Sequence, residues 1–219
     1  MERHFEKELD HLNAKIIEMG AKADEMIRTA VQSLVERRGE LLQRVFALEK
    51  DVNRLQLEID EFALRLLATQ QPVAADLRFL VAGMKINSEL ERIGDQAVNI
   101  AENTERLLQD PPLKPLIDLP IMAEHALKMV RESLESFIKR DPIEAKAVIM
   151  EDDRVDDLKD QIFRELLTYM MSDPSTIPRA LSLILISRNL ERIGDQATNI
   201  AEEVIYMVEG KDVRHPKKA

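Results

Sequence analysis

The chain has 219 residues and a formal net charge of −10, with 45% hydrophobic, 33% charged and only 4% aromatic residues. This charge argues against non-specific nucleic-acid binding, which requires Lys and Arg to neutralise phosphates. The absence of cysteine excludes disulfides and thiolate metal sites.

The composition favours helices, since Gly and Pro are scarce and Ala, Leu, Ile and charged residues are plentiful. The longest strongly apolar run, 181–186, is far too short to span a bilayer. The first residues are charged and contain no apolar core of a signal peptide. We therefore expect a cytoplasmic protein that reaches a membrane only through partners.

Turn-forming residues divide the chain into six segments with helical periodicity. Gly39 and Pro72 separate the first three segments, and Asp141-Pro142 and Pro174 separate the last three. The predicted helices are 5–37, 40–69, 74–108, 120–139, 143–171 and 177–209.

Residues 110–118 contain three prolines, which lack an amide hydrogen and clash with a preceding helical turn, so this segment is the expected linker. Short turns between long helices force neighbouring helices to alternate in direction. The sequence predicts an all-α fold of two tandem homologous three-helix bundles, spanning 1–109 and 119–219.

An internal repeat supports this division. Residues 90–102 read LERIGDQAVNIAE and residues 190–202 read LERIGDQATNIAE, so the two segments differ only at Val98 and Thr198. Further upstream, a shift of 103 residues pairs apolar positions, for example Val52 with Val155. Each copy is roughly 100 residues long, which is the size of a domain.

The repeated signature has an apolar face and an acidic face. At about 100° per residue, one face gathers the apolar residues Leu90, Ile93, Ala97, Ile100 and Ala101. Glu91, Asp95 and Glu102 gather within roughly 40° on the other side, beside Asn99. Glu191, Asp195, Glu202 and Asn199 repeat this pattern. Like charges one turn apart repel, so neighbouring Arg side chains, solvent or a cation must offset them.

The second helix of each copy offers matching oxygen ligands. The shift of 103 residues aligns Glu49 and Asn53 with Asp152 and Asp156. We define the first cluster as Glu49, Asn53, Glu91 and Asp95, and the second cluster as Asp152, Asp156, Glu191 and Asp195. Oxygen ligands suit hard cations such as Mg²⁺, Mn²⁺, Ca²⁺ or iron. Neither signature contains a His, which disfavours a catalytic zinc site.

Each of these residues also has a plainer interpretation. A single helical carboxylate pair is usually a solvated face, but two diverged copies that keep the same polar residues indicate a shared constraint on that surface. The mid-helix Gly94 and Gly194 favour close helix packing, with room for a ligand as the alternative. Arg92 and Arg192 could pair with the carboxylates, hold an anion or be solvated.

These motifs resemble those of the PhoU family of bacterial phosphate regulators. The resemblance rests on the repeated signature together with residues 53–55, NRL, and 71–78, QPVAADLR, and it covers nearly the whole chain. It implies two three-helix bundles and a negative regulator of phosphate-starvation genes and of phosphate uptake. It also implies a cytoplasmic adaptor, often dimeric, between the sensor kinase PhoR and the phosphate transporter, notably its ATPase PstB.

The resemblance also implies a metal-binding role for the acidic residues. Some family members bind multinuclear iron or other metal clusters through paired carboxylates four residues apart. Three pairs match this spacing: Glu91 with Asp95, Glu191 with Asp195 and Asp152 with Asp156. The fourth pair departs, because Asn53 replaces a carboxylate, and we expect the first cluster to bind more weakly or to hold fewer ions.

Two other functions compete with a non-catalytic adaptor. One is a carboxylate-bridged enzyme of the di-iron type, although such bundles use Glu-x-x-His motifs that point into the core. The two signatures contain no such motif, although residues 8–11 of the first helix read ELDH. The other is a scaffold that binds no metal.

Overall fold

The structure is a computed structural model that describes residues 2–213, with side chains described from Phe5 onward. Residues 214–219, the end of the predicted second bundle, lie outside the described residues. Within 2–213 the chain forms six long helices and no strand, so the predicted all-α fold is confirmed. The helices are α1 Glu2–Glu36, α2 Leu42–Gln70, α3 Ala75–Leu107, α4 Asp118–Lys139, α5 Pro142–Ser172 and α6 Ile177–Glu209.

The helix boundaries follow from local chemistry. Asp141 caps α5, because its Oδ1 accepts hydrogen bonds from the backbone N–H groups of Ile143, at 2.8 Å, and Glu144, at 3.3 Å. Pro142 occupies the first turn, where its missing N–H leaves no hydrogen bond unmade. Short 3-10 turns, Gly39–Leu41 and Pro174–Thr176, precede α2 and α6.

Arg37 shapes the turn after α1. Arg37, rather than Gly39, adopts the left-handed backbone conformation, with φ of 55°. The Arg37 guanidinium donates hydrogen bonds to backbone carbonyl oxygens at the end of α3 and just beyond it, the shortest of them 2.6 Å to Asp110. The side chain therefore satisfies helix-terminal carbonyls and fixes this turn against the start of the linker.

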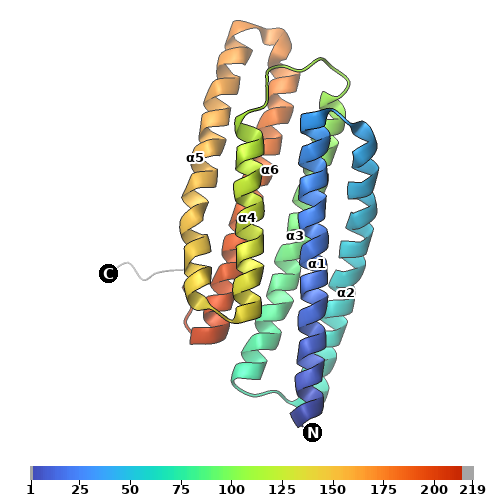
Figure 1. The fold of residues 1–219 in the computed structure, drawn as a ribbon, viewed down its shortest axis with the longest axis vertical. Helices are drawn as coiled ribbons and strands as arrows, with labels where there is room; N and C mark the ends of the chain where they lie inside the picture. Colours follow the sequence, from blue (N-terminus) through green and yellow to red (C-terminus); the bar gives the residue numbers. More distant parts are fainter. Residues whose placement is uncertain (1, 214–219) are drawn as a thin grey trace, which may run out of the picture.

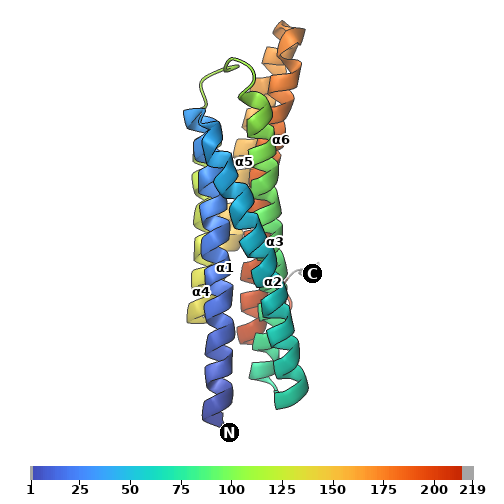
Figure 2. The same cartoon turned by 90° about the vertical axis from the view of Figure 1, so that its right-hand side faces the viewer.

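The helices alternate in direction within each copy, as Figure 1 shows. The two three-helix units then pack side by side, α3 against α6 and α1 against α4. Figure 2 shows α1 and α4 on one side of the molecule and α3 and α6 on the other. Buried apolar residues from all six helices form one continuous core, so the two predicted bundles share their hydrophobic interior.

Polar contacts fix the register between α3 and α6, which run in opposite directions (Figure 1). Lys85 Nζ lies 2.9 Å from Glu203 Oε1, and Asn199 Nδ2 lies 3.3 Å from Glu89 Oε2. Moving four residues toward the C-terminus of α3, from Lys85 to Glu89, thus moves the contact four residues toward the N-terminus of α6, from Glu203 to Asn199. The same progression brings Gly94 level with Gly194, so the two signatures lie beside each other along this interface.

None of the helices within the described range is both long enough and apolar enough to cross a membrane.

Candidate metal centre

The two faces predicted for the signature are present. Leu90, Ile93, Ala97, Ile100 and Ala101 are all 0% exposed and belong to the core. On the other side Asp95 and Glu102 are exposed, and Glu91 is partly buried. In the second copy Asp195 is exposed, and Glu191 and Glu202 are partly buried. The acidic residues therefore lie at the surface, along the edges where α3 and α6 meet other helices.

The second cluster comes together between α5 and α6. Burial raises the pKa of Asp152 to about 6, and the charges of Asp195, Asp156, Asp153 and Glu191 add to this effect. Although Asp195 is exposed overall, partial desolvation by its neighbours raises the pKa of its carboxylate, reinforced by Glu191 and Asp156 and opposed by Lys159 and Arg192. The four predicted carboxylates thus act on one another across two adjacent helices, as the alignment of the copies predicted.

Gly194 makes room for this cluster. A Cβ atom at Gly194 would lie 3.1 Å from Asp152 Oδ1 and 3.6 Å from Val155 Cγ1. A side chain at this position would therefore push the Asp152 carboxylate away from α6. Gly194 therefore packs closely against α5, and in this copy one of the groups packed against it is a predicted ligand.

A lysine already lies among these carboxylates. Lys159 Nζ is 3.4 Å from Asp156 Oδ1, 3.4 Å from Glu191 Oε1 and 3.4 Å from Asp160 Oδ1. Although partial burial lowers the pKa of Lys159, the three carboxylates outweigh that effect and raise it above its ordinary value. The side chain therefore carries a full positive charge at neutral pH.

The first cluster is more open. Burial and the charge of Asp95 raise the pKa of Glu91, opposed by Arg92. A Cβ atom at Gly94 would lie 3.4 Å from Val52 Cγ1, as Val155 lies against Gly194, so α2 and α3 repeat the register of α5 and α6. No carboxylate is among the atoms nearest to Gly94, however. Glu49 is partly buried on α2 and Asn53 is exposed.

The donor chemistry of the second cluster fits a hard cation. Its carboxylates are all oxygen donors, they repel one another, and the missing side chain at Gly194 leaves a recess that Asp152 occupies. In the part of the chain with described side chains, no three acidic or His side chains are arranged closely enough to hold a metal ion.

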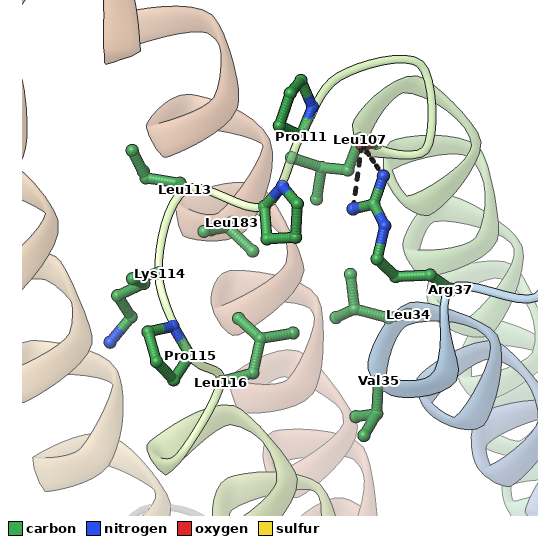
Figure 3. A pocket seen from close by; sticks show the side chains of 11 residues that line it. Leu34, Val35, Arg37, Leu107, Pro111, Leu113, Lys114, Pro115, Leu116 and Leu183 are labelled. Carbon is green, nitrogen blue, oxygen red and sulfur yellow. Dashed lines mark hydrogen bonds between the residues drawn. The ribbon is translucent and has the colours of Figure 1, made fainter.

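A second candidate region is an apolar pocket of about 240 Å³ between the end of α1, the linker and α6. Figure 3 shows leucines and prolines along its wall, with Arg37 and Lys114 at its edge. Both cations are occupied, because Arg37 donates to backbone carbonyls and Lys114 pairs with Glu165. The pocket thus has an apolar wall, and neither cation at its edge is free to bind a charged ligand. The residues that line it attach the linker to both bundles.

Sequence reasoning missed two groups that the structure brings to these surfaces. Lys159 is one, although its position three residues after Asp156 on one helical face was a usable signal. The ion pair between Lys85 and Glu203 is the other. Its partners are distant in the sequence, and only the packing of the two copies shows that they meet.

A known protein family matches this chain twice, once in each copy of the repeat. The PhoU domain family matches residues 16–104 and 119–204. The chain is 41% identical over 209 residues to the phosphate-specific transport system accessory protein PhoU homolog of Aquifex aeolicus, covering 95% of each chain.

Two crystal structures are similar over nearly the full length. The PhoU structure from Pseudomonas aeruginosa superposes with a TM-score of 0.91 at 36% identity, covering 94% of this chain and 100% of that one. The phosphate transport system regulatory protein PhoU from Streptococcus pneumoniae superposes with a TM-score of 0.88 at 27% identity, covering 96% and 100%.

Proposed function

Because the chain belongs to the PhoU family, we propose that it is a non-catalytic regulator of phosphate transport and of the phosphate-starvation response. The match of both copies to the PhoU domain, together with the full-length similarity to an accessory and a regulatory protein of phosphate transport, carries this proposal. In this role the protein restrains phosphate-starvation genes and phosphate uptake when phosphate is plentiful.

The proposed mode of action is that of an adaptor. It joins the ATPase of the phosphate transporter, PstB, to the sensor kinase PhoR, works in the cytoplasm and acts as a homodimer. The six-helix body supports such a role, since its outer helices expose large apolar side chains, among them Leu57 on α2, 69% exposed, and Met150 on α5, 79% exposed.

We further propose that the two clusters bind hard divalent or trivalent cations, iron among them. The mutual repulsion of the second-cluster carboxylates and the recess at Gly194 support this part of the proposal. Elemental analysis of protein purified from metal-replete cells tests it. Glu91→Ala and Glu191→Ala should each lower the bound metal, and protein without metal in all samples would reject metal binding while leaving the adaptor role intact.

The regulatory role has its own test. Deletion of the gene in its host should raise alkaline phosphatase activity in phosphate-rich medium, and a plasmid copy should restore repression. A pull-down from membranes, with and without phosphate, should recover PstB and PhoR with the tagged protein. Unchanged repression after deletion would reject the regulatory role.

A further inference from the structure

The hairpin end, residues 161–190, exposes large apolar side chains on both of its helices. On α5 and on α6 they recur every four residues, so each set forms a stripe along one face of its helix. We call them the hairpin patch, and each is 38–78% exposed: Phe163, Leu167, Met171, Ile177, Leu181 and Leu185. Figures 1 and 2 show the hairpin end reaching beyond the ends of α1, α3 and α4.

The two stripes lie side by side on the face of the hairpin that points away from α4. On α5, Glu165 turns to the linker, where it pairs with Lys114, and the stripe residues two positions away lie on the far side of the helix. On α6, the stripe residues are likewise two positions from the buried Leu183. Because α5 and α6 run in opposite directions, progression from the contact of Lys159 with Glu191, at 3.4 Å, brings the stripes level.

The fold does not require this face to be apolar. In the first copy Asp60, Ala68 and Lys85 stand where the second copy has Phe163, Met171 and Leu185. Two of these first-copy residues make polar contacts, because Asp60 accepts a hydrogen bond from Asn87 Nδ2 at 2.9 Å and Lys85 pairs with Glu203. The apolar face therefore belongs to the second copy and not to the packing that both copies share.

The hairpin end is also basic, although the whole chain carries a net charge of −10. It contains three arginines and two acids, and both acids are engaged: Glu165 pairs with Lys114, and Asp173 caps the turn before α6. Arg164 and Arg188 are exposed, and neither forms an ion pair with another residue that the structure describes. Both can therefore meet acidic groups of a partner.

Beyond the hairpin end the same face turns acidic. Asp156, Asp160 and Glu191 all lie 3.4 Å from the single ammonium of Lys159, so three carboxylates share one positive charge. This acidity opposes contact of the whole face with an anionic membrane. A symmetric contact with a second copy would bring identical arginines together. A short partner segment that covers only the hairpin end avoids both conflicts.

We propose that the hairpin patch is the docking surface for an amphipathic helix of a partner protein, with acidic residues beside its apolar stripe. Each stripe extends over about 12 Å of helix, so a partner helix of about three turns covers it. Its apolar residues lie between the two stripes, and its acidic residues meet Arg164 and Arg188. The inference rests on the proposed adaptor role and gives that role a contact surface.

The test measures the fluorescence anisotropy of two labelled synthetic helices, each about 18 residues long, with Leu along one face. One peptide carries Glu on both flanks of the Leu stripe, and the other carries Lys at the same positions. The proteins are the wild type, Leu167→Ser and Arg188→Glu. Leu64→Ser is the matched control, because Leu64 is the exposed first-copy counterpart of Leu167. Circular dichroism verifies that each variant is folded.

The wild type should bind the acidic peptide about tenfold more tightly than the basic one. Leu167→Ser should weaken binding of the acidic peptide by about tenfold, because it removes a buried apolar contact. Arg188→Glu should reduce or reverse the preference between the peptides, and Leu64→Ser should change neither affinity by more than about twofold.

Equal affinity for the two peptides would overturn the inference, and so would no binding by the wild type or an equal loss in Leu64→Ser. Pelleting with phosphatidylglycerol vesicles that is lost in Leu167→Ser would assign the patch to a membrane instead. Dissociation of a dimer by Leu167→Ser, seen by sedimentation velocity, would assign it to a second copy. Alkaline phosphatase repression in the deletion strain with the wild-type gene is measured separately, so failure of this inference is distinguishable from failure of the regulatory role.

Discussion

Asp152 makes the protein less stable at neutral pH in the absence of metal. Its pKa is raised from 3.8 to about 6, first by burial and then by the surrounding carboxylates. Between these values the folded protein binds more protons than the unfolded chain, so the free energy of unfolding falls as the pH rises through this window. Above pH 6 the folded state carries the full cost of the ionised carboxylate.

The size of this cost follows from the shift. One pKa unit corresponds to about 1.4 kcal/mol, and the side chain is only partly buried, so solvent screening reduces the total to about 1–2 kcal/mol. Asp152→Asn keeps the shape and removes the charge. In the presence of a chelator it should raise the free energy of unfolding by about 1–2 kcal/mol at pH 7.5, and by almost nothing below pH 4.

Urea denaturation at a series of pH values measures this difference. Asp157→Asn serves as the control, because it removes an exposed carboxylate from the same helix and should change stability by no more than about 0.5 kcal/mol. A loss of stability in Asp152→Asn at pH 7.5, or a gain that is the same at pH 4 and pH 7.5, would refute the reasoning.

Four further substitutions test the packing and capping of the helices that carry the clusters. Gly94→Ala should raise the free energy of unfolding in urea by about 0.5–1 kcal/mol, because Ala favours a helix over Gly and its Cβ would meet an aliphatic atom at an ordinary 3.4 Å. Gly194→Ala should raise it less, because its Cβ would meet a carboxylate oxygen at 3.1 Å. Lys85→Met should lower the stability measured by thermal denaturation by about 1–2 kcal/mol, because it removes the ammonium beside the Glu203 side chain, which is only 8% exposed. A loss below about 0.5 kcal/mol, which is typical of surface ion pairs, would contradict this. Asp141→Ala should cost about 1 kcal/mol through loss of the α5 cap, and equal melting temperatures would show that the cap is dispensable.

The helical spacing of apolar residues and the positions of Gly and Pro predicted much of the fold. The apolar residues of the signature predicted the buried face of α3, and three prolines marked the linker, because both depend on neighbours in the sequence. The shared core and the interface of α3 with α6 did not follow, since nothing local specifies which helix of one copy meets the other.

The sequence predicted which residues form the clusters, but not how close their side chains lie. Repetition at fixed spacing predicted the four carboxylates of the second cluster; the other three raise the pKa of Asp152 across α5 and α6, but among the described residues they are not arranged to hold a metal ion. Lys159 shares a helical face with Asp156, but its approach to Glu191 depends on how α6 packs against α5, which the sequence pattern does not provide. The proximity of Asp152 to Gly194 depends on the distance between two helices, which periodicity does not provide.

The most direct test of the account asks whether the acidic clusters are the working surface of a phosphate regulator. A deletion strain in phosphate-rich medium receives the wild-type gene, a Glu91→Gln/Asp95→Asn/Glu191→Gln/Asp195→Asn variant, or a Glu105→Gln control from the exposed side of α3. Alkaline phosphatase activity is then compared at equal protein levels. We expect the wild type and the control to restore repression and the cluster variant to leave the enzyme expressed. Full repression by the cluster variant would contradict the account.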